Sequence, residues 1–118
     1  KTASFEAIDL GLINYVAGTG KPMIMSTGMA SLDEIEDAVA AARERGATEI
    51  ALLKCTSAYP APPEEANLRT ISDLSERLSV PAGLSDHTLG IAVPVAAASS
   101  SARTLRAWMR VPLRTSRH

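Results

Sequence analysis

The polar residues best suited to chemistry lie in the stretch Ser85-Asp86-His87-Thr88, which ends a short apolar run beginning at Val80. The stretch brings two hydroxyls, a carboxylate and an imidazole together within four residues. At the carboxyl ends of parallel strands, such side chains and the loops after them build ligand sites. The sequence therefore predicts a binding site at the end of this strand.

Three further segments that read as strands also end in polar side chains. Serine hydroxyls and a lysine ammonium are suitable donors for a phosphate or a carboxylate. A carboxylate and a phenol, as at Glu6 and Tyr59, suit the hydroxyls of a sugar-like substrate. We therefore expect these strand ends to converge on one anionic substrate; the strand-end residues are Lys1, Ser4 and Glu6, then Ser26 and Thr27, then Thr56 and Ser57.

Three single residues allow more than one interpretation. His87 by itself is more typical of a hydrogen-bonded structural histidine than of a ligand of a divalent cation, since one imidazole does not make a metal site. Cys55 lies inside an apolar strand with no activating neighbour in the sequence, which favours packing over nucleophilic use. A Schiff-base aldolase would need a lysine near a barrel centre, and Lys54 is the only strand residue that could supply it.

The elements needed to position these residues follow one plan, an apolar strand, a polar strand end, a loop and a helix. Strands are expected to start near residues 2, 22, 49 and 80, with a helix in each gap. Repeated βα units demand parallel strands and right-handed crossovers. The sequence predicts an α/β fold, a partial TIM (β/α)8 barrel of about four βα units. A doubly wound open sheet is the competing topology, although no G-x-G-x-x-G fingerprint supports a dinucleotide fold.

Composition limits the alternatives. With 118 residues the chain is one domain or less, and because aromatic residues make up only 3%, its core must be aliphatic. No window reaches the roughly 18 apolar residues of a membrane helix, and no secretory signal opens the chain. The single cysteine excludes an intrachain disulfide. We expect a cytoplasmic protein that binds neither membrane nor nucleic acid.

Several motifs occur in unbroken order and together resemble the sialic acid synthase family, most closely its pseudaminic acid synthase branch. N-acetylneuraminate synthases are the close alternative. The resemblance covers about residues 1–98 and implies that they correspond to strands four to seven of the parent barrel. The motifs that carry it are Lys1-Thr2-Ala3-Ser4-Phe5-Glu6, Gly20-Lys21-Pro22, Ser26-Thr27-Gly28-Met29-Ala30, the stretch 53–60, Asn67-Leu68 and the stretch 83–90.

The resemblance implies a metal-dependent transferase that condenses phosphoenolpyruvate with an open-chain amino-sugar aldehyde and releases phosphate. In the family, a divalent metal, Mn²⁺ or Mg²⁺, polarises the aldehyde oxygen. A homodimer is also implied. Carried over by position, Lys1 and Ser4 would hold the phosphate and Ser26 the carboxylate. The remaining roles would be Ser57 and Ser85 completing this site, Glu6 and Tyr59 facing the sugar, and His87 binding the metal, with Glu6 and His87 as the catalytic residues.

The resemblance fades after Ala98, and the division expected is a partial barrel at 1–98 and an atypical tail at 99–118. The family's second metal histidine, in a Glu-Lys-His motif, has no counterpart here, and the last 16 residues carry five arginines and no acidic residue. Because the charge shift coincides with the loss of family pattern, we expect the tail to be irregular or out of frame rather than a basic binding arm. The chain alone is expected to be inactive, a truncated half barrel with unpaired sheet edges.

Overall fold

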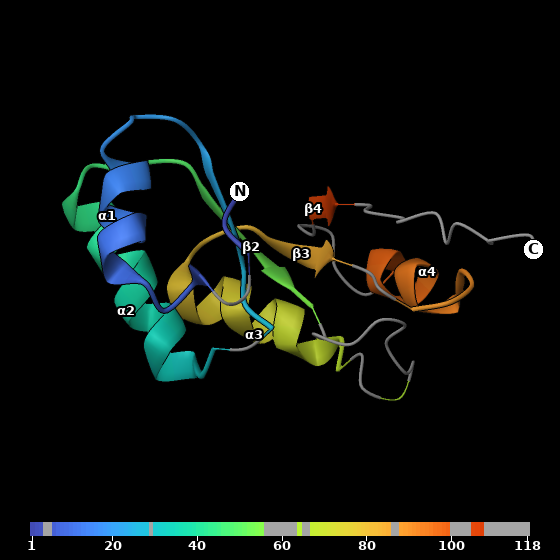
Figure 1. Cartoon of the computed structure of the whole chain (residues 1–118). Helices are drawn as coiled ribbons and strands as arrows, with labels where there is room; N and C mark the ends of the chain where they lie inside the picture. The colour runs from blue at the N-terminus through green and yellow to red at the C-terminus, as the bar shows by residue number, and fades with distance from the viewer. Residues whose placement is uncertain are drawn as a thin grey trace, which may run out of the picture.

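The computed structural model describes residues 1–3, 6–28, 30–55, 64, 67–85, 88–99 and 105–107, the last three by their backbone. Helices and strands alternate along the chain (Figure 1). The elements are α1 (Leu10–Ala17), β1 (Met23–Ser26), α2 (Leu32–Glu44), β2 (Ile50–Lys54), α3 (Arg69–Leu78), β3 (Ala82–Ser85), α4 (Ala92–Ser99) and β4 (Leu105–Ala107).

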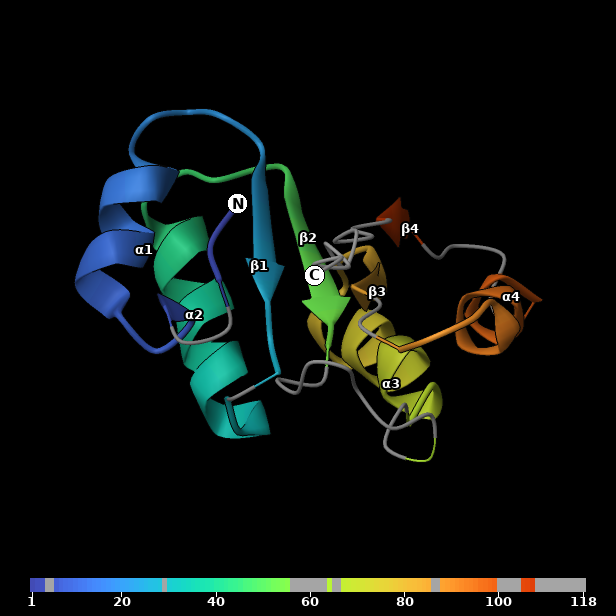
Figure 2. The same ribbon diagram turned by 45° about the vertical axis from the view of Figure 1, so that its right-hand side comes forward.

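The strands form one parallel sheet in the order β1-β2-β3-β4, so each strand pairs with the next one along the chain. The arrowheads of β1 and β2 point the same way in Figure 2. A doubly wound sheet reverses its strand order at a switch point, and these four strands show no reversal. The order confirms the α/β, partial-barrel prediction over the doubly wound alternative.

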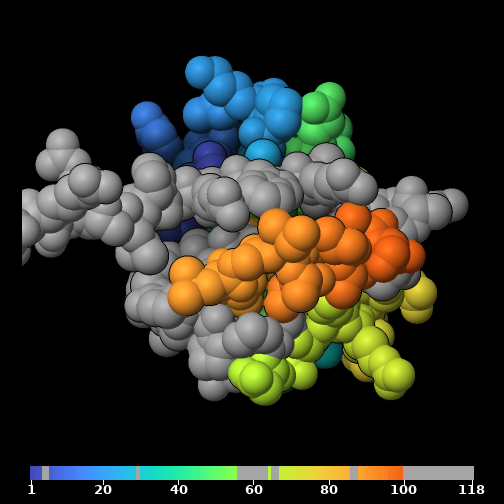
Figure 3. All heavy atoms as spheres, turned by 90° about the vertical axis from the view of Figure 1, so that its right-hand side faces the viewer, coloured from blue at the N-terminus to red at the C-terminus, as the bar shows by residue number. Residues whose placement is uncertain are grey.

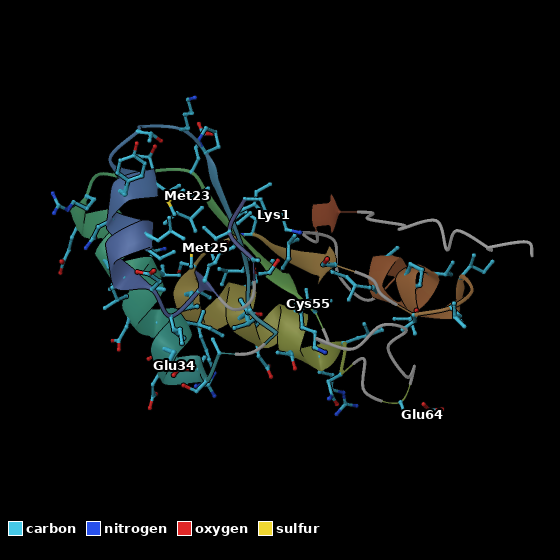
Figure 4. All side chains as sticks on the ribbon, viewed as in Figure 1. Lys1, Met23, Met25, Glu34, Cys55 and Glu64 are labelled. Atoms are coloured by element: carbon cyan, nitrogen blue, oxygen red, sulfur yellow. The ribbon has the colours of Figure 1, made fainter. Side chains whose placement is uncertain are left out.

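The sheet has two faces with different partners. Alternate strand residues, among them Met23, Met25 and Leu52, join residues of all four helices in one hydrophobic cluster. In Figure 4, Met23 and Met25 lie between β1 and the helices α1 and α2. We call this side the helix face. The opposite side, the inner face, carries the remaining strand residues: Ile24 and Ser26, Ala51 and Leu53, and Gly83 and Ser85.

The residues at both ends of helix α2 fix where the helix begins and where it stops. The backbone N–H of Glu34 donates to Ser31 Oγ at 3.3 Å, and the N–H of Ser31 donates to Glu34 Oε2 at 2.7 Å. This capping box satisfies two of the N–H groups that a helix start leaves unpaired. At the other end Gly46 adopts φ +90, a left-handed angle that terminates the helix cheaply only at glycine.

Ser31→Ala should therefore lower the free energy of unfolding by about 1 kcal/mol, because it removes the cap acceptor. Urea unfolding of the chain measures the difference. Ser99→Ala is the matched control, since the Ser99 hydroxyl donates to the Ala96 carbonyl at the far end of α4 and caps no helix start. Equal effects of the two changes would show that the capping box contributes nothing.

One strand prediction needs correction. The first segment was expected to form a strand, but of its described residues only Thr2 pairs, as an isolated parallel bridge with Met25. Within the segment 99–118, Leu105–Ala107 forms β4 against β3, and Ser99 ends α4. Residues 100–104 and 108–118 lie outside the described part of the chain, so the division at residue 98 stays a prediction.

Thr2 is buried, with 4% of its surface exposed, and its Oγ1 has no hydrogen-bond partner among the described residues. A buried unsatisfied hydroxyl costs about 1–3 kcal/mol. Thr2→Val should therefore raise the free energy of unfolding by about 1 kcal/mol. Thr27→Val is the control with the opposite sign, because Thr27 Oγ1 donates to the Leu53 carbonyl at 3.2 Å. A loss of stability in both variants, read by urea unfolding, would contradict this account of Thr2.

Helix α4 lies at the surface on the side of the molecule seen in Figure 3. Its Val93 and Ala97 are buried in the hydrophobic cluster, whereas Val95 is 59% exposed. Pro94 falls in the first turn, where a helix tolerates it. Over the described residues, no helix is long and apolar enough to cross a bilayer.

Candidate functional site

The structure brings two of the predicted substrate-binding serines to one face of the sheet. Ser26 pairs with Leu53 across β1 and β2, and Leu53 pairs with Gly83, two residues before Ser85 on β3. Registered residues of parallel strands point to the same face, so Ser26 and Ser85 both lie on the inner face, each at the carboxyl end of its strand.

Both serines are nearly inaccessible, with 4% and 3% of their surfaces exposed. A hydrogen bond to an anion is stronger in such a low-dielectric setting than in water. The N–H of Ser26 donates to the Thr2 carbonyl at 3.1 Å, which ties the first segment to this end of β1. The two hydroxyls therefore belong to the buried part of the inner face, at the same end of the sheet.

Lys1 and Glu6 come from the segment beside β1. Thr2 is in register with Met25 on the helix face, so strand alternation places Lys1 on the inner-face side. Glu6 is exposed and its Oε2 accepts the N–H of Ala3 at 2.7 Å, which holds the carboxylate against this segment. The other predicted site residues, Ser4, Ser57, Tyr59 and His87, lie outside the described residues.

Lys54 does not occupy the position that a Schiff-base aldolase requires. It pairs with Leu84, which belongs to the hydrophobic cluster of the helix face. Lys54 also lines a cavity of about 530 Å³ together with Ile35 of α2 and Asp73 of α3. The sequence suggested a lysine near the barrel centre, and the register places it on the opposite side of the sheet.

Cys55 follows β2 directly and is buried, in line with the packing role predicted for it. Figure 4 labels it beyond the carboxyl end of that strand. Among the residues that the structure describes, no group of three or more His, Cys, Asp or Glu side chains could hold a metal ion. The described part of the site is thus made of hydroxyls, one lysine and one glutamate, which suits an anion and a polyol.

Two further inner-face residues lie near the serines, and the local sequence does not single them out. Leu53 separates Ser26 from β3, and Gly83 follows it in the same row. These two residues can be identified only when the register between neighbouring strands is known, because the strand limits alone do not show which residues lie side by side.

Known proteins resemble this chain in sequence and in fold. The model of the NeuB family matches residues 1–107. The chain belongs to the NeuB family. This family match extends past the point at which the resemblance was expected to end, into β4.

Several curated relatives are named as synthases of sugar acids. The chain is 46% identical over 102 residues to the pseudaminic acid synthase of Helicobacter pylori, covering 86% of this chain and 30% of that protein. It is 40% identical over 104 residues to the N,N'-diacetyllegionaminic acid synthase of Campylobacter jejuni, covering 86% and 31%. It is 36% identical over 106 residues to the mouse N-acetylneuraminate-9-phosphate synthase, covering 89% and 29%.

Two solved structures have the same fold over this region. The spore coat polysaccharide biosynthesis protein spsE of Bacillus subtilis matches with TM-score 0.82 and 36% identity, over 86% of this chain and 29% of that one. The N-acetylneuraminic acid synthetase of Leptospira borgpetersenii, solved with citrate, matches with TM-score 0.80 and 36% identity, over 86% and 35%. The chain thus spans about a third of the length of its NeuB relatives.

Proposed function

We propose that this chain forms part of a pseudaminic acid synthase, an enzyme that condenses phosphoenolpyruvate with an open-chain amino-sugar aldehyde. The observation that carries the proposal is the position of Ser26 and Ser85, at the carboxyl ends of two strands and on one face of a NeuB-family sheet. The 46% identity to a pseudaminic acid synthase favours this branch.

The proposed roles follow the charges of the substrate. Lys1 and Ser4 hold the phosphate, Ser26 holds the carboxylate, and Ser57 and Ser85 complete the site. Charge-assisted hydrogen bonds of this kind are about twice as strong as neutral ones. A tricarboxylate, citrate, is named with the Leptospira relative, which agrees with an affinity of this fold for anions.

The reaction then needs three bond changes. The methylene carbon of phosphoenolpyruvate attacks the aldehyde carbon and forms the new carbon–carbon bond, while the aldehyde oxygen takes up a proton. Water adds to the resulting cationic carbon and releases a proton. The bond from that carbon to the phosphate oxygen then breaks, and the hydroxyl left on the carbon becomes the ketone as its proton goes to the leaving phosphate. Glu6 and Tyr59 face the sugar and orient its hydroxyls, which keeps the aldehyde in position for attack.

His87 is the proposed nitrogen ligand of a divalent metal, Mn²⁺ or Mg²⁺, which when bound supplies Lewis-acid polarisation. In the sequence it follows Ser85, the last residue of β3, by two residues. One imidazole is an incomplete ligand set. The proposed substrates and the homodimer belong to the whole synthase, of which this chain provides one part.

A chimera tests the proposal. The 102 aligned residues of this chain replace their counterparts in the Helicobacter pylori pseudaminic acid synthase. We expect the chimera to release phosphate from phosphoenolpyruvate in the presence of the diacetamido-trideoxy hexose and Mn²⁺. A folded chimera without this activity would contradict the proposed function.

A second host separates the branches of the family. The same segment placed in the Campylobacter legionaminic acid synthase should retain less of its host's activity than in the pseudaminic host. The reverse order would favour the alternative, an N-acetylneuraminate or legionaminic acid synthase.

The 118-residue chain alone is expected to release no phosphate, because it covers only 30% of the length of the Helicobacter pylori synthase. The assay contains phosphoenolpyruvate, the diacetamido-trideoxy hexose and Mn²⁺, and the intact relative serves as the positive control. Phosphate release by the chain itself would show that four βα units suffice for catalysis.

A further inference from the structure

The cavity of about 530 Å³ that Lys54 lines lies on the helix face, between α2 and α3. Its apolar wall includes Ile35 of α2 and Leu74 of α3, which both belong to the hydrophobic cluster. Thr27, which directly follows β1, lines it as well. Pockets for small molecules have volumes of about 300–1,000 Å³ and combine apolar walls with a few polar groups. The cavity therefore has the size and the lining of a small-molecule site.

The charged side chains around this cavity favour an anion. Lys54 and Arg77 supply two cations, and Asp73, one turn before Arg77 on α3, is the only carboxylate among the described lining residues. The positive end of the α3 dipole adds to their potential, because Thr70 of its first turn lines the cavity and the helix start has no side-chain cap. Arginine binds a carboxylate through two parallel hydrogen bonds, and lysine acts as a point charge. The lining thus suits a ligand with one carboxylate or phosphate.

Uncharged polar groups extend the lining beyond a simple anion site. The Thr70 hydroxyl and the Asn67 amide can both donate to and accept from the hydroxyls of a ligand. Asp73 is exposed, and its carboxylate is an acceptor for groups of the same kind. An anion that also carries several hydroxyls would use the whole set. The sugar acid formed when phosphoenolpyruvate condenses with an amino-sugar aldehyde has this composition.

The cavity is separate from the proposed substrate site but adjoins two of its strand ends. Thr27 lines the cavity and directly follows Ser26, whereas Ser26 itself does not line it. Cys55 lines the cavity too, and in the sequence it lies two residues before Ser57. A ligand in the cavity would therefore contact residues next to the serines proposed to bind phosphoenolpyruvate. Two sites coupled through shared elements change each other's affinity by about 5- to 150-fold.

We propose, on the basis of the function above, that this cavity is a second, regulatory binding site for the sugar-acid product of the synthase. Arg77 and Lys54 bind the carboxylate of the product. Asn67, Thr70 and Asp73 bind its hydroxyls. Because the cavity lies on the helix face and the substrate serines lie on the inner face, the product binds there while phosphoenolpyruvate occupies the substrate site.

The test is calorimetric titration of the Helicobacter pylori chimera with pseudaminic acid at saturating phosphoenolpyruvate, without the aldehyde. We expect one equivalent to bind. Arg77→Gln should raise the Kd of pseudaminic acid about tenfold or more, the equivalent of one hydrogen bond to a charged group. Lys54→Met should act in the same direction. Arg69→Gln is the matched control and should leave the Kd within twofold, because Arg69 is an exposed arginine of the same helix that does not line the cavity.

Phosphate release with the aldehyde present gives the regulatory readout. Pseudaminic acid should slow it even at saturating phosphoenolpyruvate, where competition in the substrate site is overcome, and Arg77→Gln should remove this inhibition.

Three results would overturn the inference alone. The first is binding of pseudaminic acid that disappears at saturating phosphoenolpyruvate, since the product would then bind only in the substrate site. The second is a Kd that Arg77→Gln changes no more than Arg69→Gln does. The third is binding without any effect on phosphate release. A folded, unsubstituted chimera that releases no phosphate would overturn the proposed function and the inference with it.

Discussion

Ser85→Ala in the chimera should raise the KM for phosphoenolpyruvate about 10- to 150-fold, the equivalent of one hydrogen bond to a charged group. Ser85 is buried on the inner face, so no water can replace the lost donor without entering the site. Ser26→Ala should act in the same direction, because its hydroxyl is proposed to hold the other end of the same anion. Steady-state phosphate release at varied phosphoenolpyruvate measures both.

Ser31→Ala makes the same chemical change at the start of α2, where the hydroxyl only caps a helix. It should lower stability but leave KM unchanged. If Ser85→Ala raised KM no more than Ser31→Ala does, the serine would be a structural residue and its assignment to the substrate site would be wrong.

Leu52→Ala is the stability change with the largest expected effect. Leu52 is 0% exposed, is in register with Met25 and Ala82, and lies at the centre of the cluster that joins the sheet to the helices. Truncating a buried leucine costs about 2–5 kcal/mol. Because a domain is stable by only about 5–15 kcal/mol, the variant should approach unfolding. Urea unfolding followed by circular dichroism reports the change.

Leu89→Ala is the control for this prediction. The side chain of Leu89 is 65% exposed, and changes at such positions are worth about 0.5 kcal/mol or less. Similar losses at both positions would mean that the cluster on the helix face does not stabilise the chain.

Features written in local sequence could be predicted. The capping box at Ser31 and Glu34 needs only residues three apart, and the structure has both of its hydrogen bonds. Asp9 directly precedes α1 and is a residue type favoured at a helix start, and its Oδ1 accepts the Leu12 N–H at 3.0 Å. The polar strand ends at Ser26 and Ser85 are also local, since each marks where an apolar run stops.

Features that depend on pairing between strands could not be predicted from the sequence. The continuous apolar run before Lys54 does not tell which face that lysine occupies, and only its register with Leu84 decides it. Strand β4 has only three residues, Leu105–Ala107, too few for a pattern to predict it, and its pairing with β3 defines it.

The strand order β1-β2-β3-β4 also bears on synthesis at the ribosome. Each strand after β1 pairs with the strand translated just before it. These four strands can therefore add to the sheet one at a time, at one edge, while the nascent chain lengthens.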